Sequence, residues 1–133
     1  MLALALAGGC QKTPAVDCTP PPAVLACPDP TGAGPNFTTT VYPQVFAVVC
    51  SNCHAPGQTE ASMPLTSYAQ IYGKNGSEAQ EIFNQVFEAC LMPPGNASAP
   101  LTADERQTLL DWFACGAQDL PAPSPTPDGG ARD

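Results

Sequence analysis

Five consecutive residues have the types and spacing of a cofactor attachment site. They read Cys50-Ser-Asn-Cys53-His54. Two thiols three residues apart lie on one side of a helical turn, so both can add to the vinyl groups of one porphyrin. The adjacent His54 can then give its imidazole to the iron. The pattern predicts one covalently attached haem c, bound through Cys50 and Cys53, with His54 as the proximal axial ligand.

Two other chemistries use similar motifs. A thioredoxin-like dithiol also has the form C-x-x-C, but it belongs in an alternating strand–helix pattern, which this sequence lacks. A zinc site could use Cys50, Cys53 and His54, but adjacent Cys53 and His54 rarely serve together. His54 is the only histidine in the chain. With no further histidine, the chain cannot complete a usual zinc ligand set. One histidine also excludes bis-histidine ligation of a haem within the chain, and the single C-x-x-C-H motif excludes a second haem.

The other face of the iron needs a second axial ligand or stays open. A methionine thioether is a suitable ligand, and the candidates are Met63 and Met92. Both precede proline, which favours extended backbone suited to a loop that crosses the ring. Met92 starts the run Met92-Pro93-Pro94 between two helical patterns and is the predicted iron ligand. Met63 is the weaker candidate, with a hydrophobic contact at the haem rim as its expected role.

Apolar residues at helical spacing surround these motifs, and no segment alternates as a β-strand would. Ser77 with Gln80, and Thr102 with Glu105, have the spacing of capping boxes. The sequence therefore predicts an all-α fold of three to five helices whose core includes the porphyrin. We expect helices over residues 42–52 and 68–72, from Ser77, and from Thr102 to near Gly116.

The chain has seven cysteines, and an odd number calls for an account of each one. Two are assigned to haem and one to lipid, and the remaining four allow three disulfide connectivities. We favour a Cys18–Cys27 disulfide, since these two residues lie in one region of the chain. The other disulfide then joins Cys90 to Cys115. Disulfides persist in oxidising compartments, so the cysteine content favours an exported protein.

The N-terminus resembles a bacterial export signal. Small and apolar residues lead up to Cys10, as in the lipobox of bacterial lipoproteins, where the cysteine becomes lipidated. We expect residues 1–10 to be a signal or lipobox-like remnant and residues 11–35 to be a Pro-rich linker. An ordinary signal-peptide remnant is the alternative. Gln11 is not the aspartate of inner-membrane retention, so the resemblance implies a lipid-anchored protein of the periplasm or cell envelope, with the outer membrane preferred.

Composition limits the domain organisation and the partners. The length of 133 residues suits one small domain, expected over residues 36–120, followed by a disordered tail over 121–133. The formal charge of −8 argues against binding to nucleic acid, which needs clustered Lys and Arg. The acidity suits solubility or docking to a basic partner. No apolar run approaches the length that spans a membrane.

The order of the motifs resembles that of a small monohaem cytochrome c domain. The resemblance covers about residues 37–120 and implies a helical fold around haem c, with His54 and Met92 on the iron and an exposed haem edge. It also implies that the Pro56 carbonyl accepts a hydrogen bond from the His54 ring. The motifs are Tyr42-x-x-Val45-Phe46, Cys50-x-x-Cys53-His54, Met92-Pro93-Pro94, Leu101-Thr102-x-x-Glu105, Leu109-x-x-Trp112 and Gly116-Ala117.

The leading hypothesis for function is electron transfer, because a six-coordinate iron has no open position for substrate. We therefore expect an electron carrier rather than an enzyme, working with redox partner proteins or as an accessory domain of an oxidoreductase. The rival class is a haem-based binding or sensing protein with a displaceable or open sixth position. A peroxidase is disfavoured, since it normally needs a distal His or Arg, and the domain offers only His54, already used, and Arg106.

Overall fold

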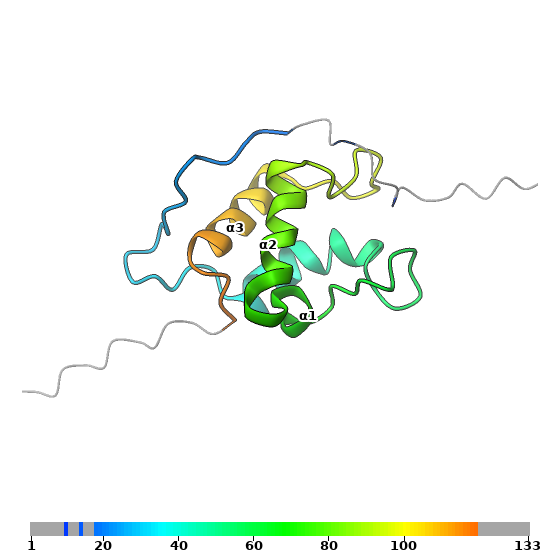
Figure 1. Ribbon diagram of the computed structural model, residues 1–133, viewed down its shortest axis with the longest axis horizontal. Coiled ribbons are helices and arrows are strands. Elements are labelled where there is room, and N and C mark those ends of the chain that lie inside the picture. The colour runs from blue at the N-terminus through cyan, green and yellow to red at the C-terminus, as the bar shows by residue number, and fades with distance from the viewer. Residues whose placement is uncertain (1–9, 11–13, 15–17, 120–133) are drawn as a thin grey trace, which may run out of the picture.

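The computed structural model describes residues 10, 14 and 18–119, and within these ranges the chain is helical and has no strand. This confirms the all-α prediction. The predicted signal remnant, apart from Cys10, and the predicted tail lie outside the described residues. Three α-helices, α1 (Tyr68–Tyr72), α2 (Ser77–Phe83) and α3 (Ala103–Ala114), form the centre of the molecule (Figure 1). The other helical segments are the π-helices η1 (Phe37–Phe46) and η4 (Asn84–Glu88) and the 3₁₀ helices η2 (Cys50–Asn52) and η3 (Lys74–Gly76).

The first helix begins earlier than the apolar pattern predicts. η1 starts at Phe37 because the side chain of Asn36 accepts a hydrogen bond from the backbone N–H of Thr39 at 2.9 Å. Pro43 therefore lies inside the helix rather than in its first turn. The wider π spacing of the backbone hydrogen bonds accompanies this proline, which has no N–H to donate. η1 ends before Cys50, and the separate short helix η2 begins there.

The two predicted capping boxes have different outcomes. At the start of α3, the hydroxyl of Thr102 accepts from the Glu105 N–H at 3.2 Å, and the Glu105 carboxylate accepts from the Thr102 N–H at 2.8 Å. This box is confirmed. At the start of α2, the cap is Gly76, with a left-handed backbone and no side-chain hydrogen bond, so the box from Ser77 to Gln80 is wrong. α1 covers the residues 68–72 that were predicted.

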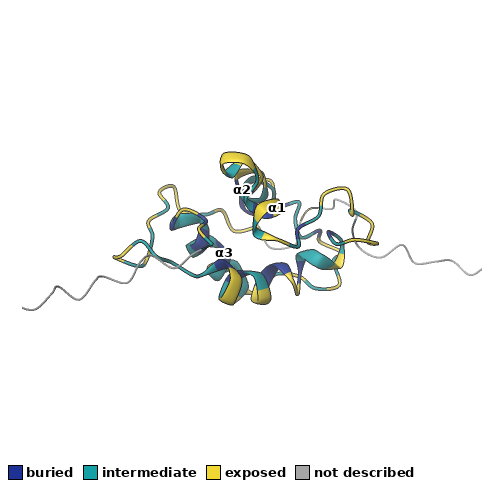
Figure 2. Cartoon of the chain, turned by 90° about the horizontal axis from the view of Figure 1, so that it is seen from below, coloured by how far each residue is buried: buried dark blue, intermediate teal, exposed yellow. Residues whose placement is uncertain are grey.

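Aromatic rings join the helices into one core. The ring of Phe37 lies 5.2 Å from that of Tyr68 and 5.6 Å from that of Trp112, measured between centroids. Phe37 thus joins η1 to both α1 and α3. The Trp112 indole N–H donates to the Gln118 carbonyl at 2.9 Å, so this buried polar group has a partner. Exposed residues lie on the outward faces of the helices and in the loops between them (Figure 2).

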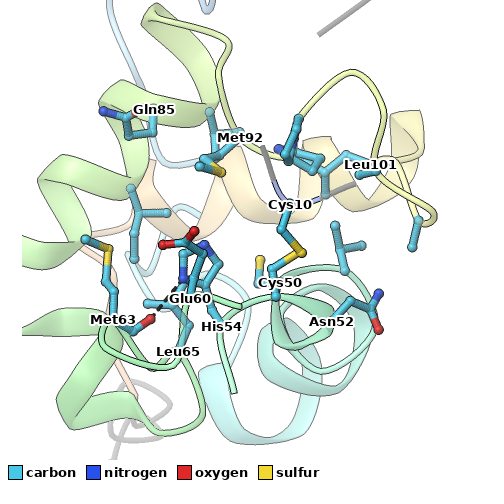
Figure 3. Close-up of a pocket in the computed structure, with 18 of the residues that line it drawn as sticks. Cys10, Cys50, Asn52, His54, Glu60, Met63, Leu65, Gln85, Met92 and Leu101 are labelled. Atoms are coloured by element: carbon cyan, nitrogen blue, oxygen red, sulfur yellow. Dashed lines mark hydrogen bonds between the residues drawn. A yellow bond between two sulfur atoms is a disulfide. The ribbon is translucent and has the colours of Figure 1, made fainter. Parts of the chain in front are cut away.

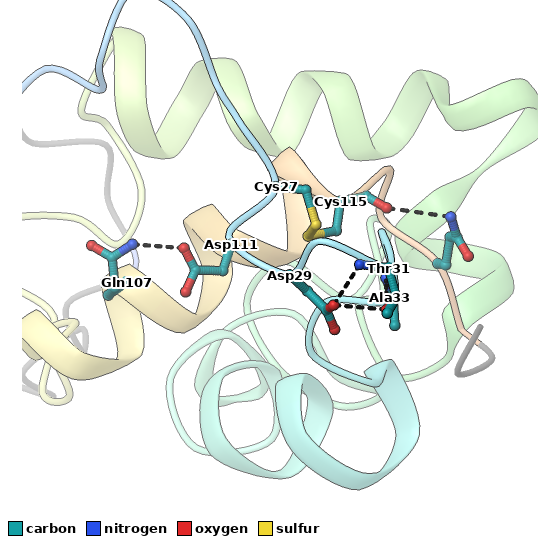
Figure 4. The surroundings of a disulfide bond; sticks show 8 residues. Cys27, Asp29, Thr31, Ala33, Gln107, Asp111 and Cys115 are labelled. Carbon is teal, nitrogen blue, oxygen red and sulfur yellow. Dashed lines mark hydrogen bonds between the residues drawn. A yellow bond between two sulfur atoms is a disulfide. The ribbon is translucent and has the colours of Figure 1, made fainter. Parts of the chain in front are cut away.

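The disulfides differ from the expected pairing. Residues 18–34 run across the outside of the helices instead of closing a local loop (Figure 1). Cys18 therefore bonds to Cys90 rather than to Cys27. Cys27 bonds to Cys115, at the end of α3 (Figure 4). A third disulfide joins Cys10 to Cys53.

These three disulfides indicate an extracellular or otherwise oxidising compartment. In a domain of this size they add stability that a small core supplies poorly by itself. Among the described helices, none has the length and apolar character needed to cross a membrane.

Gly34 provides a test of how closely the N-terminal segment packs on α3. A Cβ at Gly34 would lie 2.5 Å from the Cys115 Cβ and 2.7 Å from its sulfur. We expect Gly34→Ala to lower the free energy of unfolding by about 2–4 kcal/mol, since it combines overpacking with a left-handed φ of 60°. The measurement is denaturant unfolding of oxidised protein.

Gly32→Ala is the matched control, because Gly32 also has a positive φ, of 76°, but open space around its Cβ position. It isolates the backbone cost, which is about 1–2 kcal/mol. Equal losses in the two variants would show that the contact with the Cys27–Cys115 disulfide is not tight.

Candidate functional site

A cavity of about 390 Å³ lies in the half of the molecule that contains the C-x-x-C-H motif (Figure 3). All four predicted site residues, Cys50, Cys53, His54 and Met92, line it. The structure thus brings together residues that lie far apart in the sequence. The remaining wall is largely apolar, as a flat hydrophobic ligand requires. Its aliphatic side chains include Val45, Val49, Leu65, Ile82, Val86 and Leu109.

His54 is held in one orientation and one tautomer. It is buried, with 8% of its surface exposed, and its Nδ1 lies 2.9 Å from the backbone carbonyl of Met63. A carbonyl only accepts, so Nδ1 carries a proton, and in the neutral tautomer with this hydrogen bond the lone pair lies on Nε2. Nε2 is therefore the ring nitrogen that could bind a metal. The expected acceptor was the Pro56 carbonyl, and that prediction is wrong.

The backbone around His54 supports this arrangement. The N–H of His54 donates to the Cys50 carbonyl at 2.9 Å, and the His54 carbonyl accepts from the Leu65 N–H at 2.9 Å. The loop between His54 and Leu65 is thereby closed at its base. This closure brings the Met63 carbonyl over the ring nitrogen. No side-chain motif encodes a carbonyl acceptor, so this contact could not be predicted from the sequence.

The two candidate methionines have different surroundings. Met92 is partly buried against the core, and its N–H donates to the Gln85 carbonyl at 3.1 Å. Its side chain and that of His54 reach the cavity from opposite sides in Figure 3. Met63 lines the rim of the same cavity and is 53% exposed. Of the two, Met92 is better placed to serve as a buried thioether ligand.

Cys50 is the one free cysteine of the chain. Desolvation of its sulfur by burial raises the pKa of the thiol to about 12, and the negative charge of Glu105 adds to the rise. The residue as a whole is partly exposed, but this thiol is protonated at neutral pH and is a weak nucleophile.

The disulfide between Cys10 and Cys53 corrects two predictions. The Cys10 sulfur cannot carry a lipid while it is bonded to Cys53, so the structure does not support a lipoprotein anchored at Cys10. For the same reason, Cys53 cannot hold a haem thioether in this form of the chain. Cys10 instead lines the cavity itself, beside the C-x-x-C-H motif (Figure 3). Sequence reasoning had placed Cys10 in an anchor and missed this contact.

The family assignment also needs correction. The described part of the chain contains no group of three or more His, Cys, Asp or Glu residues that could hold a metal ion. No family model matches the chain, and no curated protein or solved structure matches it either. The likeness of motif order to a small monohaem cytochrome c domain is therefore not supported as a family relationship.

The rim of the cavity is acidic. Glu60, Glu78 and Glu81 are among its lining residues, while the structure's described part has only two cationic side chains, Lys74 and Arg106. The Arg106 guanidinium lies over the Phe87 ring, 4.6 Å from its centroid. The rim therefore carries negative charge that favours a cationic partner over an anionic one.

The raised pKa of Cys50 predicts slow alkylation of the native thiol. A rise from 9.0 to about 12 lowers the thiolate fraction at neutral pH about a thousandfold. We expect iodoacetamide to label oxidised native protein far more slowly than the same protein in denaturant, and the native rate to increase up to pH 12. Mass spectrometry gives the rate, and Cys50→Ala is the unlabelled control. Equal rates in native and denatured protein at pH 7 would contradict the burial of this thiol.

Proposed function

We propose that this chain is an electron-transfer protein of the periplasm or cell envelope that carries one haem in the cavity. The observation that carries the proposal is the hydrogen bond from His54 Nδ1 to the Met63 carbonyl at 2.9 Å. It leaves Nε2 as the ring nitrogen available to iron, and such an outer hydrogen bond orients a ligating histidine and raises its basicity. No family match contributes to this proposal.

The donor set and the cavity wall fit a haem. His54 would hold the iron through its imidazole and Met92 through its thioether, a donor pair that would raise the reduction potential. Cys50 and Cys53 would supply thiols for the vinyl groups. The aliphatic wall would keep water from the porphyrin faces, which favours the less charged, reduced iron. Bound haem supplies a reversible one-electron couple, and the polypeptide tunes it.

Attachment at Cys53 has a chemical requirement. A dithiol reductant must first open the Cys10–Cys53 disulfide, a step that consumes two electrons and two protons and yields two thiols. Attachment at Cys50 and Cys53 would add each S–H group across a vinyl C=C bond, so it would need no further oxidant. Cys50 needs no such reduction, since its sulfur is already a thiol.

The proposal is tested by expressing the full chain with a haem-attachment system in an oxidising compartment and measuring its mass. We expect the polypeptide plus one haem, joined by thioether bonds that survive denaturation. Cys50→Ala/Cys53→Ala is the control that should lose covalent attachment. A mass equal to that of the bare polypeptide, with no haem absorbance, would overturn the proposal.

Spectra of the loaded protein test the ligand assignment separately. Met92→Ala should abolish the weak long-wavelength methionine–iron band of the oxidised protein, because it removes the thioether ligand. Met63→Ala should keep the band, because the contact of Met63 with His54 uses a backbone carbonyl that the substitution retains. Loss of the band in Met63→Ala alone would reverse the assignment.

A further inference from the structure

We propose that the disulfide between Cys18 and Cys90 positions Met92 at the cavity, and that Cys18 and Cys90 are therefore positioning residues for the sixth ligand. The role in ligation rests on the proposed function, whereas the mechanical role concerns the polypeptide alone. The sequence provides the first reason, since Cys90 lies only two residues before Met92. A constraint on Cys90 therefore limits where the Met92 backbone can lie.

The backbone at Cys90 needs such a constraint. Cys90 is 3% exposed and has a φ of 54°, in the left-handed region that residues with a Cβ rarely adopt. A conformation of this kind persists only where the surroundings hold it. The disulfide to Cys18 is one such restraint. The second is the Gln85 carbonyl, which accepts from the N–H groups of both Leu91, at 2.8 Å, and Met92, at 3.1 Å.

The partner of Cys90 is itself fixed to the folded domain. The side chain of Arg106, on α3, donates a hydrogen bond to the carbonyl of Thr19, the residue next to Cys18. The same guanidinium packs on Phe87, in η4. Cys18 is therefore held to the folded domain through its neighbour Thr19. Its disulfide to Cys90 links the segment that precedes Met92 to α3. Arg106 also contacts η4, so this segment is restrained by both η4 and α3.

The second disulfide of the N-terminal segment gives a contrast. Cys27 bonds to Cys115 at the C-terminal end of α3, in surroundings made of Asp29, Thr31 and Ala33 (Figure 4). None of the four cysteines in these two disulfides lines the cavity, so the disulfides differ in how near they lie to Met92 along the chain. The two disulfides attach the same segment to the same domain, but only the one at Cys90 adjoins the Met92 turn. Removing each disulfide in turn therefore distinguishes a general loss of stability, expected for both, from a change in the position of Met92, expected only for the disulfide at Cys90.

The experiment uses the full haem-loaded chain and compares Cys18→Ala/Cys90→Ala with Cys27→Ala/Cys115→Ala. We expect the first variant to bind carbon monoxide to the reduced iron at least about tenfold faster than the parent, since loss of a tether lowers the local concentration of the thioether. Its methionine–iron band should weaken and its reduction potential should fall. The Cys27→Ala/Cys115→Ala variant should match the parent in all three. Equal behaviour of the two variants would overturn the inference.

A second measurement does not depend on haem. Amide hydrogen exchange in the haem-free chain should be at least about tenfold faster at Leu91 and Met92 in Cys18→Ala/Cys90→Ala than in the other variant, because these N–H groups lose part of their restraint. If the chain takes up no haem but this difference appears, the proposed function fails and the mechanical inference holds. If haem binds and exchange is unchanged, the inference fails.

A milder variant covers the case in which loss of the buried Cys90 sulfur unfolds the domain. Arg106→Gln keeps all three disulfides but removes the cation that holds the Thr19 carbonyl and packs on Phe87. It should change carbon monoxide binding and exchange at Met92 in the same direction by about two- to threefold. An Arg106→Gln variant identical to the parent in both would contradict the link between Cys18 and α3.

Discussion

The chemistry available in the cavity depends on one hydrogen bond, from His54 Nδ1 to the Met63 carbonyl. It assigns the proton to one ring nitrogen and leaves the other as a base. The bond exists because the chain returns over itself, with the Leu65 N–H on the His54 carbonyl. If this loop opened, the imidazole would lose both its orientation and its tautomer. The side chain that defines the site is thus controlled by backbone groups of its own loop.

Local signals predicted the helical content well. α1 has the residues predicted for it, and the start of α3 follows from Thr102 and Glu105, which lie close together in the sequence. Their hydrogen bonds need nothing from the rest of the fold. The start of α2 was misjudged because Gly76 adopts a left-handed conformation and leaves Ser77 inside the helix. In that place backbone geometry, which no capping pattern reveals, overrides the side-chain signal.

Residues that line the cavity could be named from the sequence, but the disulfide partners around them were predicted wrongly. Cys50, Cys53, His54 and Met92 were named from their types and spacing, and they line one cavity. The disulfide partners were wrong because they depend on the path of residues 18–34, which has no hydrophobic period to indicate where it runs. The Cys10–Cys53 bond was missed because Cys10 lies 43 residues before Cys53 in the sequence and had been assigned to a lipid anchor.

Cys53 cannot serve in the disulfide and in haem attachment at the same time, because one sulfur cannot form both a disulfide and a thioether. In the form described, Cys53 is bonded to Cys10, and the neighbouring Cys50 stays protonated because its sulfur is desolvated. Neither cysteine presents a thiolate at neutral pH, so both are poor targets for alkylation. The Cys10–Cys53 disulfide can still be opened by a thiolate that attacks one of its sulfurs. If haem attaches as proposed, attachment at Cys53 requires this disulfide to be opened first. The disulfide-bonded form would then precede that step, with His54 already held by its hydrogen bond to the Met63 carbonyl.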